Sequence, residues 1–368
     1  MGTARKLLAQ FGLPQQLYSQ SYEALRQVVS ETQATALLRA PEGLTVLLDQ
    51  TWNWLQEDRA SRRILTLGDS LYPQSLLNIE DPPVMLYAIG AASLWEQGGL
   101  NTCAERCLAV VGSRNPTPQG AANARQFSVA LSQAGLSIVS GMALGIDGAA
   151  HEGALEGAGP EQLATIAVVG TGLDRVYPKQ HRVLAHRIAQ HGVLLSEYAL
   201  GTPPLAANFP QRNRIISGLA RGTLVVEAAL QSGSLITARL ASEQGKDVFA
   251  IPGSIHSTQA RGCHALIKQG AKLVESAQDV LEELQWNLAA ASAINSGAPQ
   301  ADTSGVDDLF GSESGLLGAM GFDPVSLDAL QARTGLDTAA LQAQLMSLEL
   351  QGELNRLPGG LFQRLVEG

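Results

Sequence analysis

Short apolar runs alternate with helical patterns through the middle of the chain, from about residue 108 to about residue 276. The runs are rich in β-branched residues and carry few polar ones, which is typical of strands covered on both faces of a sheet. Between the runs, apolar residues recur at helical spacing. This alternation predicts an α/β domain with a parallel sheet and right-handed crossovers. The predicted strands are 108–112, 136–141, 164–170, 192–197, 222–228, 246–253 and 271–276.

The segment before this alternation is helical. Residues 1–65 show short helical patterns and predict a small helical domain. The α/β domain is predicted to occupy 66–286, with a lead-in where Pro82 and Pro83 end any helix and 84–89 forms a strand.

The segment after the alternation divides into two parts. Residues 287–315 are rich in Ala, Ser, Gly and Asp without apolar period, so we expect a flexible linker. Residues 316–368 hold two helical patterns joined at Gly335, followed by a hairpin with Pro-Gly-Gly at its turn. This order predicts a winged-helix domain.

Charge is distributed unevenly along the chain. The formal net charge is −9 over 368 residues, which by itself argues against a nucleic-acid partner. Residues 104–275, however, hold 15 basic and 11 acidic side chains, whereas 276–368 hold 3 basic and 13 acidic ones. A winged helix that reads DNA presents a basic face, so the acidic C-terminal region favours a contact with protein. The hydrophobic fraction of 45% is that of a globular chain.

Cysteine usage and hydropathy point to a cytoplasmic protein. Cys103, Cys107 and Cys263 are too few for a disulfide framework and lack zinc spacing, so we expect reduced thiols and no metal. No apolar stretch is long enough to span a bilayer, and the first residues lack the features of a secretory signal.

Glycine-marked loops follow the predicted strands, where parallel α/β sheets bind their ligands. In the first loop, Gly112 ends a strand, and Ser113 and Arg114 lead to a helix that begins near Gln119. A helix N-terminus offers free N–H groups to an anion, and a guanidinium matches phosphate geometry. The pattern is not G-x-G-x-x-G, so no nicotinamide cofactor is expected.

The second loop contains Ser140 and Gly141, with Gly145 opening a helix that carries Asp147 and His151 on one face. These residue types also occur in hydrolase triads. The absence of a G-x-S-x-G elbow favours a simple pairing of Asp147 with His151 instead. No further ligand lies nearby in sequence to complete a metal site.

Two more loops bring cations to the same sheet edge. In the third, Gly172 allows close backbone approach and Lys179 follows on the same loop. In the fourth, Phe209 precedes Arg212 and Arg214 at a helix start, where the helix dipole favours an anion. Phe209 either stacks on a nucleobase or fills the core.

The fifth loop leads from a strand that ends near Glu227 into a helix opened by Gly233 and Ser234, with Thr237 one turn in. This helix start is again suited to an anion. Glu227 is expected to orient an arginine, or alternatively to act as a base. With this many cations on one rim, the sequence predicts a run of phosphates as the ligand.

The motifs "VVGSRNPTPQG", "IVSGMALGIDGAAHEGAL", "TGLDRVYPKQH", "NFPQRNRIISGL", "SGSLITARLASEQGKDVFAIPG" and "GCHALIKQGAKLV" occur in this order. Together they resemble the bacterial DNA-processing protein A (DprA, or Smf) family, from about Tyr72 to Val274. The resemblance implies a Rossmann-like core, a SAM-like or helix-hairpin-like N-terminal domain and an appended winged helix.

The resemblance also implies a function. It implies a cytoplasmic protein, not an enzyme and without a cofactor, that binds and protects single-stranded DNA and loads the RecA recombinase during natural transformation or recombination. It implies a homodimer formed around His264, Ile267 and Leu273. The candidate DNA contacts are Gly112, Ser113, Arg114, Ser140, Gly141, Gly145, Gly172, Lys179, Phe209, Arg212, Asn213, Arg214, Gly233, Ser234 and Thr237.

Two alternatives stay open at this stage. A nucleotide or nucleoside-phosphate hydrolase on a related fold would use Glu227 as its acid, although no second carboxylate stands beside it. A winged-helix transcription regulator with a ligand-sensing domain is the other alternative, and the acidic C-terminal region argues against it.

Overall fold

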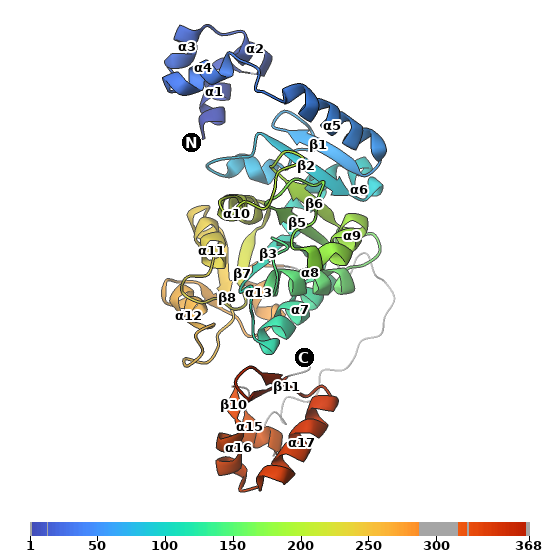
Figure 1. Cartoon of the computed structure of the whole chain (residues 1–368), viewed down its shortest axis with the longest axis vertical. Coiled ribbons are helices and arrows are strands. Elements are labelled where there is room, and N and C mark those ends of the chain that lie inside the picture. The colour runs from blue at the N-terminus through green and yellow to red at the C-terminus, as the bar shows by residue number, and fades with distance from the viewer. Residues whose placement is uncertain (1, 13, 287–315, 322–323, 366–368) are drawn as a thin grey trace.

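The computed structural model describes residues 2–12, 14–286, 316–321 and 324–365 of the chain (Figure 1). The linker predicted at 287–315 lies outside the described residues.

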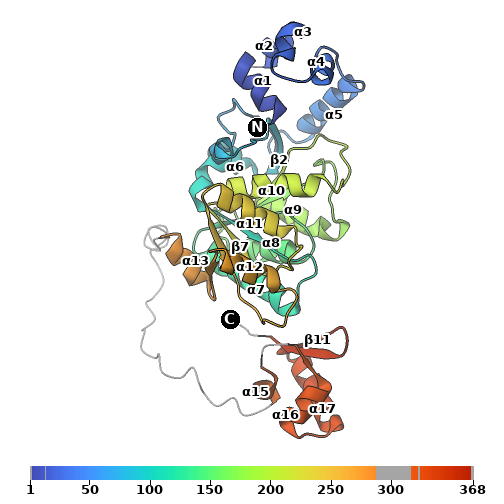
Figure 2. The same ribbon diagram turned by 90° about the vertical axis from the view of Figure 1, so that its left-hand side faces the viewer.

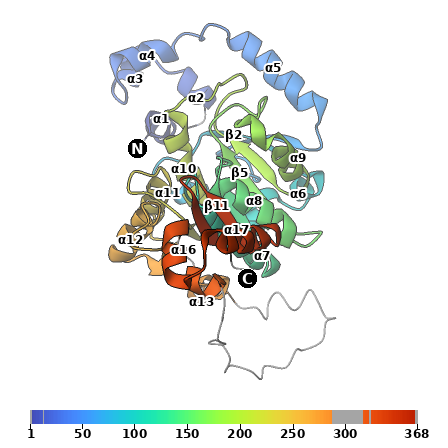
Figure 3. The same cartoon turned by 60° about the horizontal axis from the view of Figure 1, so that its bottom comes forward.

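The N-terminal region is helical, as predicted. Its helices are α1 (Thr3–Phe11), α2 (Pro14–Tyr18), α3 (Tyr22–Arg26), α4 (Glu31–Leu37) and α5 (Leu44–Glu57). Leu7, Leu17, Leu25 and Ala34 form a small core between the first four helices. Helix α5 stands apart from them (Figure 3), and its Trp54 packs on the α/β domain.

The central sheet has nine strands in the order β1-β2-β6-β5-β4-β3-β7-β8-β9. The strands are β1 (Arg62–Thr66), β2 (Met85–Gly90), β3 (Cys107–Val111), β4 (Ser137–Ser140), β5 (Thr165–Val169), β6 (Val193–Ser196), β7 (Gly222–Val225), β8 (Asp247–Ala250) and β9 (Lys272–Leu273). All the predicted strands are present, and β3 to β9 are parallel.

The sheet differs from the prediction at one edge. Strands β1 and β2 run antiparallel to their neighbours, so the sheet is mixed and mostly parallel. Strand β1 was not predicted, and the boundary expected between residues 65 and 66 falls inside it. Strand β1 begins with Arg62 and Arg63, which are charged and half-buried. It therefore lacks the continuous apolar run by which the other strands were predicted.

Helices cover both faces of the sheet, and one of the two helical layers faces the viewer in Figure 2. Alternate residues of β3 face opposite layers. One layer contains α7 (Pro118–Gln133), α8 (Ile146–Gly157), α9 (Arg182–His191) and α13 (Ala277–Glu283). The other contains α10 (Asn208–Leu219), α11 (Ser234–Glu243) and α12 (Arg261–Lys268). Shorter helical pieces are η1 (Gln74–Asn78), α6 (Ala92–Glu96), η2 (Gly99–Arg106) and η3 (Lys179–His181).

The order of the parallel strands reverses between β3 and β7. Chains that leave neighbouring strands for opposite helical layers open a crevice at the carboxyl ends of those strands, which is where such folds bind ligands. The glycine-marked loops singled out in the sequence all lie at this edge, which we call the carboxyl rim. It comprises 112–117 after β3, 141–145 after β4, 170–178 after β5 and 226–233 after β7.

The C-terminal region has the predicted winged-helix elements and its own buried core. They are α15 (Leu316–Met320), β10 (Val325–Ser326), α16 (Leu327–Thr334), α17 (Thr338–Leu350), β11 (Leu354–Leu357) and β12 (Leu361–Arg364). Gly335 ends α16 with a φ of 69°, a conformation that favours glycine. The three strands pair in the order β10-β12-β11. Within the described ranges, no helix combines the length and apolar character that crossing a membrane requires.

Candidate nucleic-acid interface

An exposed cation and two aromatic rings meet at the centre of the carboxyl rim. The guanidinium carbon of Arg114 lies 5.6 Å from the centroid of the Phe209 ring. Phe209 also meets Tyr177, with centroids 5.8 Å apart and planes tilted by 39°. The Phe209 ring also covers Gly170, where an added Cβ would lie 3.1 Å from its Cδ1. Two loops, after β3 and after β5, and helix α10 thus contribute to one surface.

Lys179 is a second cation close to this surface in the chain. It is exposed and begins η3, two residues after Tyr177. Among the described residues, neither Arg114 nor Lys179 has a carboxylate within ion-pair distance. Both cations therefore remain available to an anionic ligand. We name Arg114, Phe209, Tyr177 and Lys179 the rim cluster.

Phe209 is a surface residue and not a core plug. It is half-buried and belongs to none of the buried apolar clusters in the part of the chain that the structure describes. Tyr177, which sequence reasoning passed over as a site residue, is 47% exposed beside it. Tyr177 could have been predicted as a site residue because it lies two residues before the candidate Lys179.

Arg212 lies beneath the rim. Its side chain is buried, and Nη1 donates to the carbonyl oxygens of Gly141 and Val168, at the ends of β4 and β5. Burial lowers the pKa of Arg212 to about 10, against the opposing effect of the Asp147 carboxylate. Arg212 therefore holds α10 against the sheet. It is not the exposed phosphate ligand that the sequence predicted.

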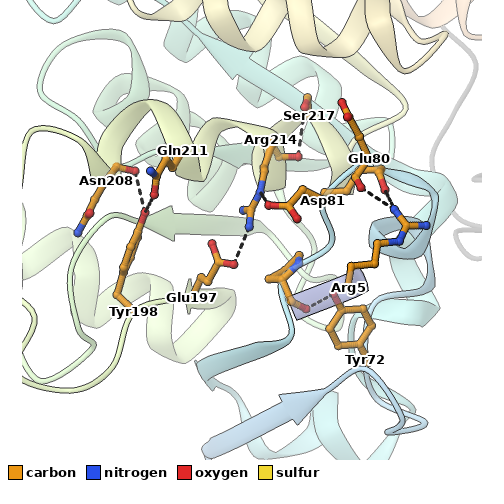
Figure 4. Close-up of polar contacts among 12 residues, drawn as sticks. Arg5, Tyr72, Glu80, Asp81, Glu197, Tyr198, Asn208, Gln211, Arg214 and Ser217 are labelled. Atoms are coloured by element: carbon orange, nitrogen blue, oxygen red, sulfur yellow. Dashed lines mark hydrogen bonds and ion pairs between the residues drawn. The ribbon is translucent and has the colours of Figure 1, made fainter. Parts of the chain in front are cut away.

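Arg214 points to the opposite side of α10. Its Nη2 lies 2.6 Å from Glu197 Oε1 and its Nε 3.5 Å from Asp81 Oδ2 (Figure 4). Residues two apart in a helix are separated by about 200° around its axis, so Arg212 and Arg214 cannot share a face. The structure does not place Arg214 among the cations of the rim.

The N-terminus of α7 is occupied by a carboxylate of the chain itself. Thr117 donates to Glu227 from its hydroxyl at 2.6 Å and from its backbone nitrogen at 2.9 Å. Burial raises the pKa of Glu227. The first loop therefore lacks the open helix terminus that the sequence predicted. Glu227 neither orients an arginine nor stands free as a base.

Asp147 and His151 do not pair, in contrast to the expectation. Asp147 accepts hydrogen bonds from the backbone nitrogens of Gly141 and Ala143, each at 3.2 Å. His151 Nδ1 lies 2.7 Å from Thr165 Oγ1. Ser140 Oγ donates to the Val110 carbonyl, so no triad is assembled.

The remaining candidates mostly shape the backbone of the rim. Gly145 has a φ of 81°, and a side chain there would collide with Ser113 and Pro116. Gly112, Gly141 and Gly172 likewise have no room for a side chain.

The start of α11 holds the last group of candidates. Gly233 is open to space, and its carbonyl accepts from Asn213 Nδ2 at 3.2 Å. The hydroxyl of Ser234 is 2.7 Å from that of Ser232, whereas Thr237 is buried. The backbone nitrogen of Ser234 donates to Ser232 Oγ at 3.4 Å, and those of Leu235 and Ile236 donate to the carbonyls of Ser232 and Gly233 at 3.2 Å each, so this helix terminus is already satisfied within the chain. Among described residues, no three His, Cys, Asp or Glu side chains could hold a metal ion.

The expected dimer residues lie at the far edge of the sheet. Leu273 is 49% exposed on β9, the edge strand. Ile267 packs partly against the core of α10 and α11. His264 Nε2 lies 2.9 Å from the Gly253 carbonyl. Leu230 and Ile255 add exposed apolar surface.

The fold and the rim define a Rossmann-like α/β protein with a cationic, aromatic carboxyl rim and an appended winged helix. A model of the DNA recombination-mediator protein A family matches residues 63–285, more than half of the chain, and a model of the DprA winged helix domain matches residues 300–360. The chain belongs to this DNA-processing family, as the sequence motifs predicted.

Individual relatives agree with this assignment. Protein Smf of Escherichia coli is 41% identical over 309 residues, which cover 83% of this chain and 78% of the relative. DNA processing protein DprA of Streptococcus pneumoniae is 48% identical over 218 residues, covering 59% of this chain and 73% of the relative.

Solved structures agree as well. The X-ray structure of DNA processing protein A from Streptococcus pneumoniae matches with a TM-score of 0.61 and 38% identity, over 76% of this chain and 92% of that one. The protein of the same name from Helicobacter pylori, described for its single-stranded DNA binding mode, matches with a TM-score of 0.52 and 31% identity, over 61% of this chain and 96% of that one.

Proposed function

We propose that this protein binds single-stranded DNA without sequence preference along its carboxyl rim. The observation that carries the proposal is the rim cluster, in which two aromatic rings are in contact, the unpaired Arg114 lies over one of them, and the unpaired Lys179 follows the other by two residues. Cations attract phosphates whatever the sequence, and rings stack on any base. A duplex hides its bases inside its stack, so the rings favour a single strand.

The order of the strands gives the bound DNA a path along the rim. The rim runs from the end of β7 through those of β3 and β4 to that of β5. Along it lie in turn the α11 terminus at Gly233, then Arg114, then Phe209 with Tyr177, and finally Lys179. We place phosphates at the two cations and bases against the rings.

In the cell, we propose that the protein protects incoming single-stranded DNA and loads the RecA recombinase on it during natural transformation or recombination, in the cytoplasm. A homodimer through the β9 edge, with Leu273 at its centre, fits the exposed apolar side chains there. The acidic winged helix is proposed to contact protein and not DNA.

We propose that the protein is not an enzyme. The hydrolase alternative depended on Glu227, and this carboxylate is engaged with Thr117 at the start of α7. Incubation with nucleoside monophosphates should release no free base, and release that depends on Glu227 would restore the alternative.

Gel-shift titration with single- and double-stranded oligonucleotides of matched length tests the binding proposal. The wild-type protein should retain single strands of unrelated sequence with similar affinity and duplexes more weakly. The doubly substituted protein Arg114→Ala, Lys179→Ala should lose most of that affinity. Arg125→Ala removes an exposed arginine of α7 that pairs with Glu156, away from the rim, and is the matched control. Equal retention of duplex and single strand would contradict the proposal.

A further inference from the structure

Helix α10, which brings Phe209 to the rim, is fixed on its far side by the ion pairs of Arg214. Glu197 follows β6, and Asp81 belongs to the segment that leads into β2 (Figure 4). The Arg214 side chain is 17% exposed and that of Glu197 24%, so this pair is partly shielded from solvent, whereas Asp81 is 47% exposed. One guanidinium thus joins α10 to two separate parts of the chain.

The loop that carries Glu197 also holds the first turn of α10. Tyr198, the next residue, donates from its hydroxyl to the Asn208 carbonyl at 3.1 Å and lies 3.4 Å from Gln211 Oε1. A displacement of this loop therefore reaches both ends of the α10 segment between Asn208 and Arg214. Phe209 lies within that segment.

The segment that carries Asp81 is in turn held by helix α1. Arg5 of α1 donates from Nη1 to the carbonyl oxygens of Ile79 and Glu80, at 3.1 and 2.5 Å. Gly2 approaches the Asp81 carboxylate so closely that a side chain there would clash with it. Arg5 therefore holds the backbone next to Asp81, and the Asp81 carboxylate meets Arg214 of α10.

We propose that Arg214 is a positioning residue for single-stranded DNA, which acts by setting the place of Phe209 and does not touch the strand. The inference rests on the proposed function of the rim. Removal of the guanidinium leaves the Glu197 and Asp81 carboxylates facing each other without a cation, and like charges separate. The loop at Glu197 and Tyr198 then shifts, and the first turn of α10 moves with it. Phe209 lies about 7.5 Å along the helix from Arg214, given a rise of about 1.5 Å per residue.

A double-mutant cycle tests the inference. Affinity for a fluorescent oligothymidine is measured by anisotropy for the wild type, Arg214→Gln, Phe209→Ala and the double variant. If Arg214 acts through Phe209, Arg214→Gln weakens binding about 5- to 10-fold in the wild-type background and less than about 2-fold beside Phe209→Ala. Equal losses in the two backgrounds, or no loss, would overturn the inference.

Salt dependence separates positioning from direct contact. A phosphate contact contributes about 0.7 to the slope of log affinity against log salt for a single strand. Arg214→Gln should leave that slope unchanged, whereas Arg114→Ala should reduce it. A slope reduced by Arg214→Gln would mean that Arg214 meets a phosphate itself, and the inference would be wrong.

Controls keep the result interpretable. Arg125→Gln breaks the ion pair of similar length with Glu156 between α7 and α8, and should leave binding unchanged. Arg214→Lys keeps a charge beside the two acids and should recover part of the affinity. Glu197→Gln is a milder variant for the same cycle if Arg214→Gln does not fold. A wild-type protein that binds no single strand contradicts the proposed function, whereas a wild type that binds and an unchanged Arg214→Gln contradict only this inference.

Discussion

The guanidinium of Arg114 lies over the ring of Phe209, 5.6 Å from its centroid, although the two residues come from opposite helical layers of the α/β domain. Arg114 follows β3 on the way to α7, and Phe209 begins α10. The Phe209 ring packs over Gly170, which follows β5, so the contact joins the ends of β3 and β5 across the carboxyl rim. A cation that can meet a phosphate and an aromatic ring that can meet a base thus lie side by side.

Replacement of Arg114 by alanine should weaken single-strand binding to a similar degree for every sequence. A hydrogen bond to a charged group contributes roughly 1.5–3 kcal/mol, so a loss of about tenfold or more is expected at moderate salt. The slope against salt should fall by about 0.7. Anisotropy titrations with two unrelated oligonucleotides at two salt concentrations measure both quantities. A sequence-dependent loss would count against a phosphate contact.

Phe209→Ala should weaken binding without changing the salt slope, because the ring carries no charge. Base stacking contributes about 1–3 kcal/mol per base, and Tyr177→Ala should cost a similar amount if each ring takes one base. Tyr18→Ala removes an aromatic ring that is 66% exposed on α2, away from the rim, and serves as the control. Unchanged affinity of Phe209→Ala for oligothymidine would show that the ring takes no base.

The strands of the core were predictable because each is a short apolar run, buried on both faces. Strand β1 was not, since Arg62 and Arg63 give it the pattern of a half-exposed edge. The site was predictable as a set of loops, because parallel strands bring their carboxyl ends to one edge.

The direction of each side chain was not predictable. Whether Arg212 or Arg214 faces the rim depends on the rotation of α10, which is set by distant partners such as Gly141 and Glu197. Glu227 and Thr117 are far apart in sequence, so no local sequence pattern predicts their contact.

His151 should make the folded state sensitive to acid. Burial lowers the pKa of His151 to about 3 from an ordinary value of 6.5. Between these two pKa values, His151 is protonated in the unfolded chain but not in the folded protein. The contribution of His151 to the free energy of unfolding is therefore fully present above pH 6.5 and is lost as the pH falls toward 3. The loss approaches about 1.4 kcal/mol per pH unit in that window. Urea unfolding at pH 7, 6 and 5 should show a weaker dependence for His151→Asn, whereas His191→Asn, at an exposed position, should behave as the wild type.

Leu273→Asp should dissociate the proposed homodimer. Leu273 is 49% exposed on the edge strand β9, beside an unpaired row of backbone groups, and a carboxylate there would be buried without a partner on association. Sedimentation equilibrium of the wild type should give twice the mass of the variant. Val183→Asp introduces the same charge at an apolar side chain of α9 that is 72% exposed and should leave the mass unchanged. The Leu273→Asp monomer should keep its rim intact, so any fall in its DNA affinity would measure how far two rims act on one strand. A wild type that sediments as a monomer would remove β9 from consideration as an interface.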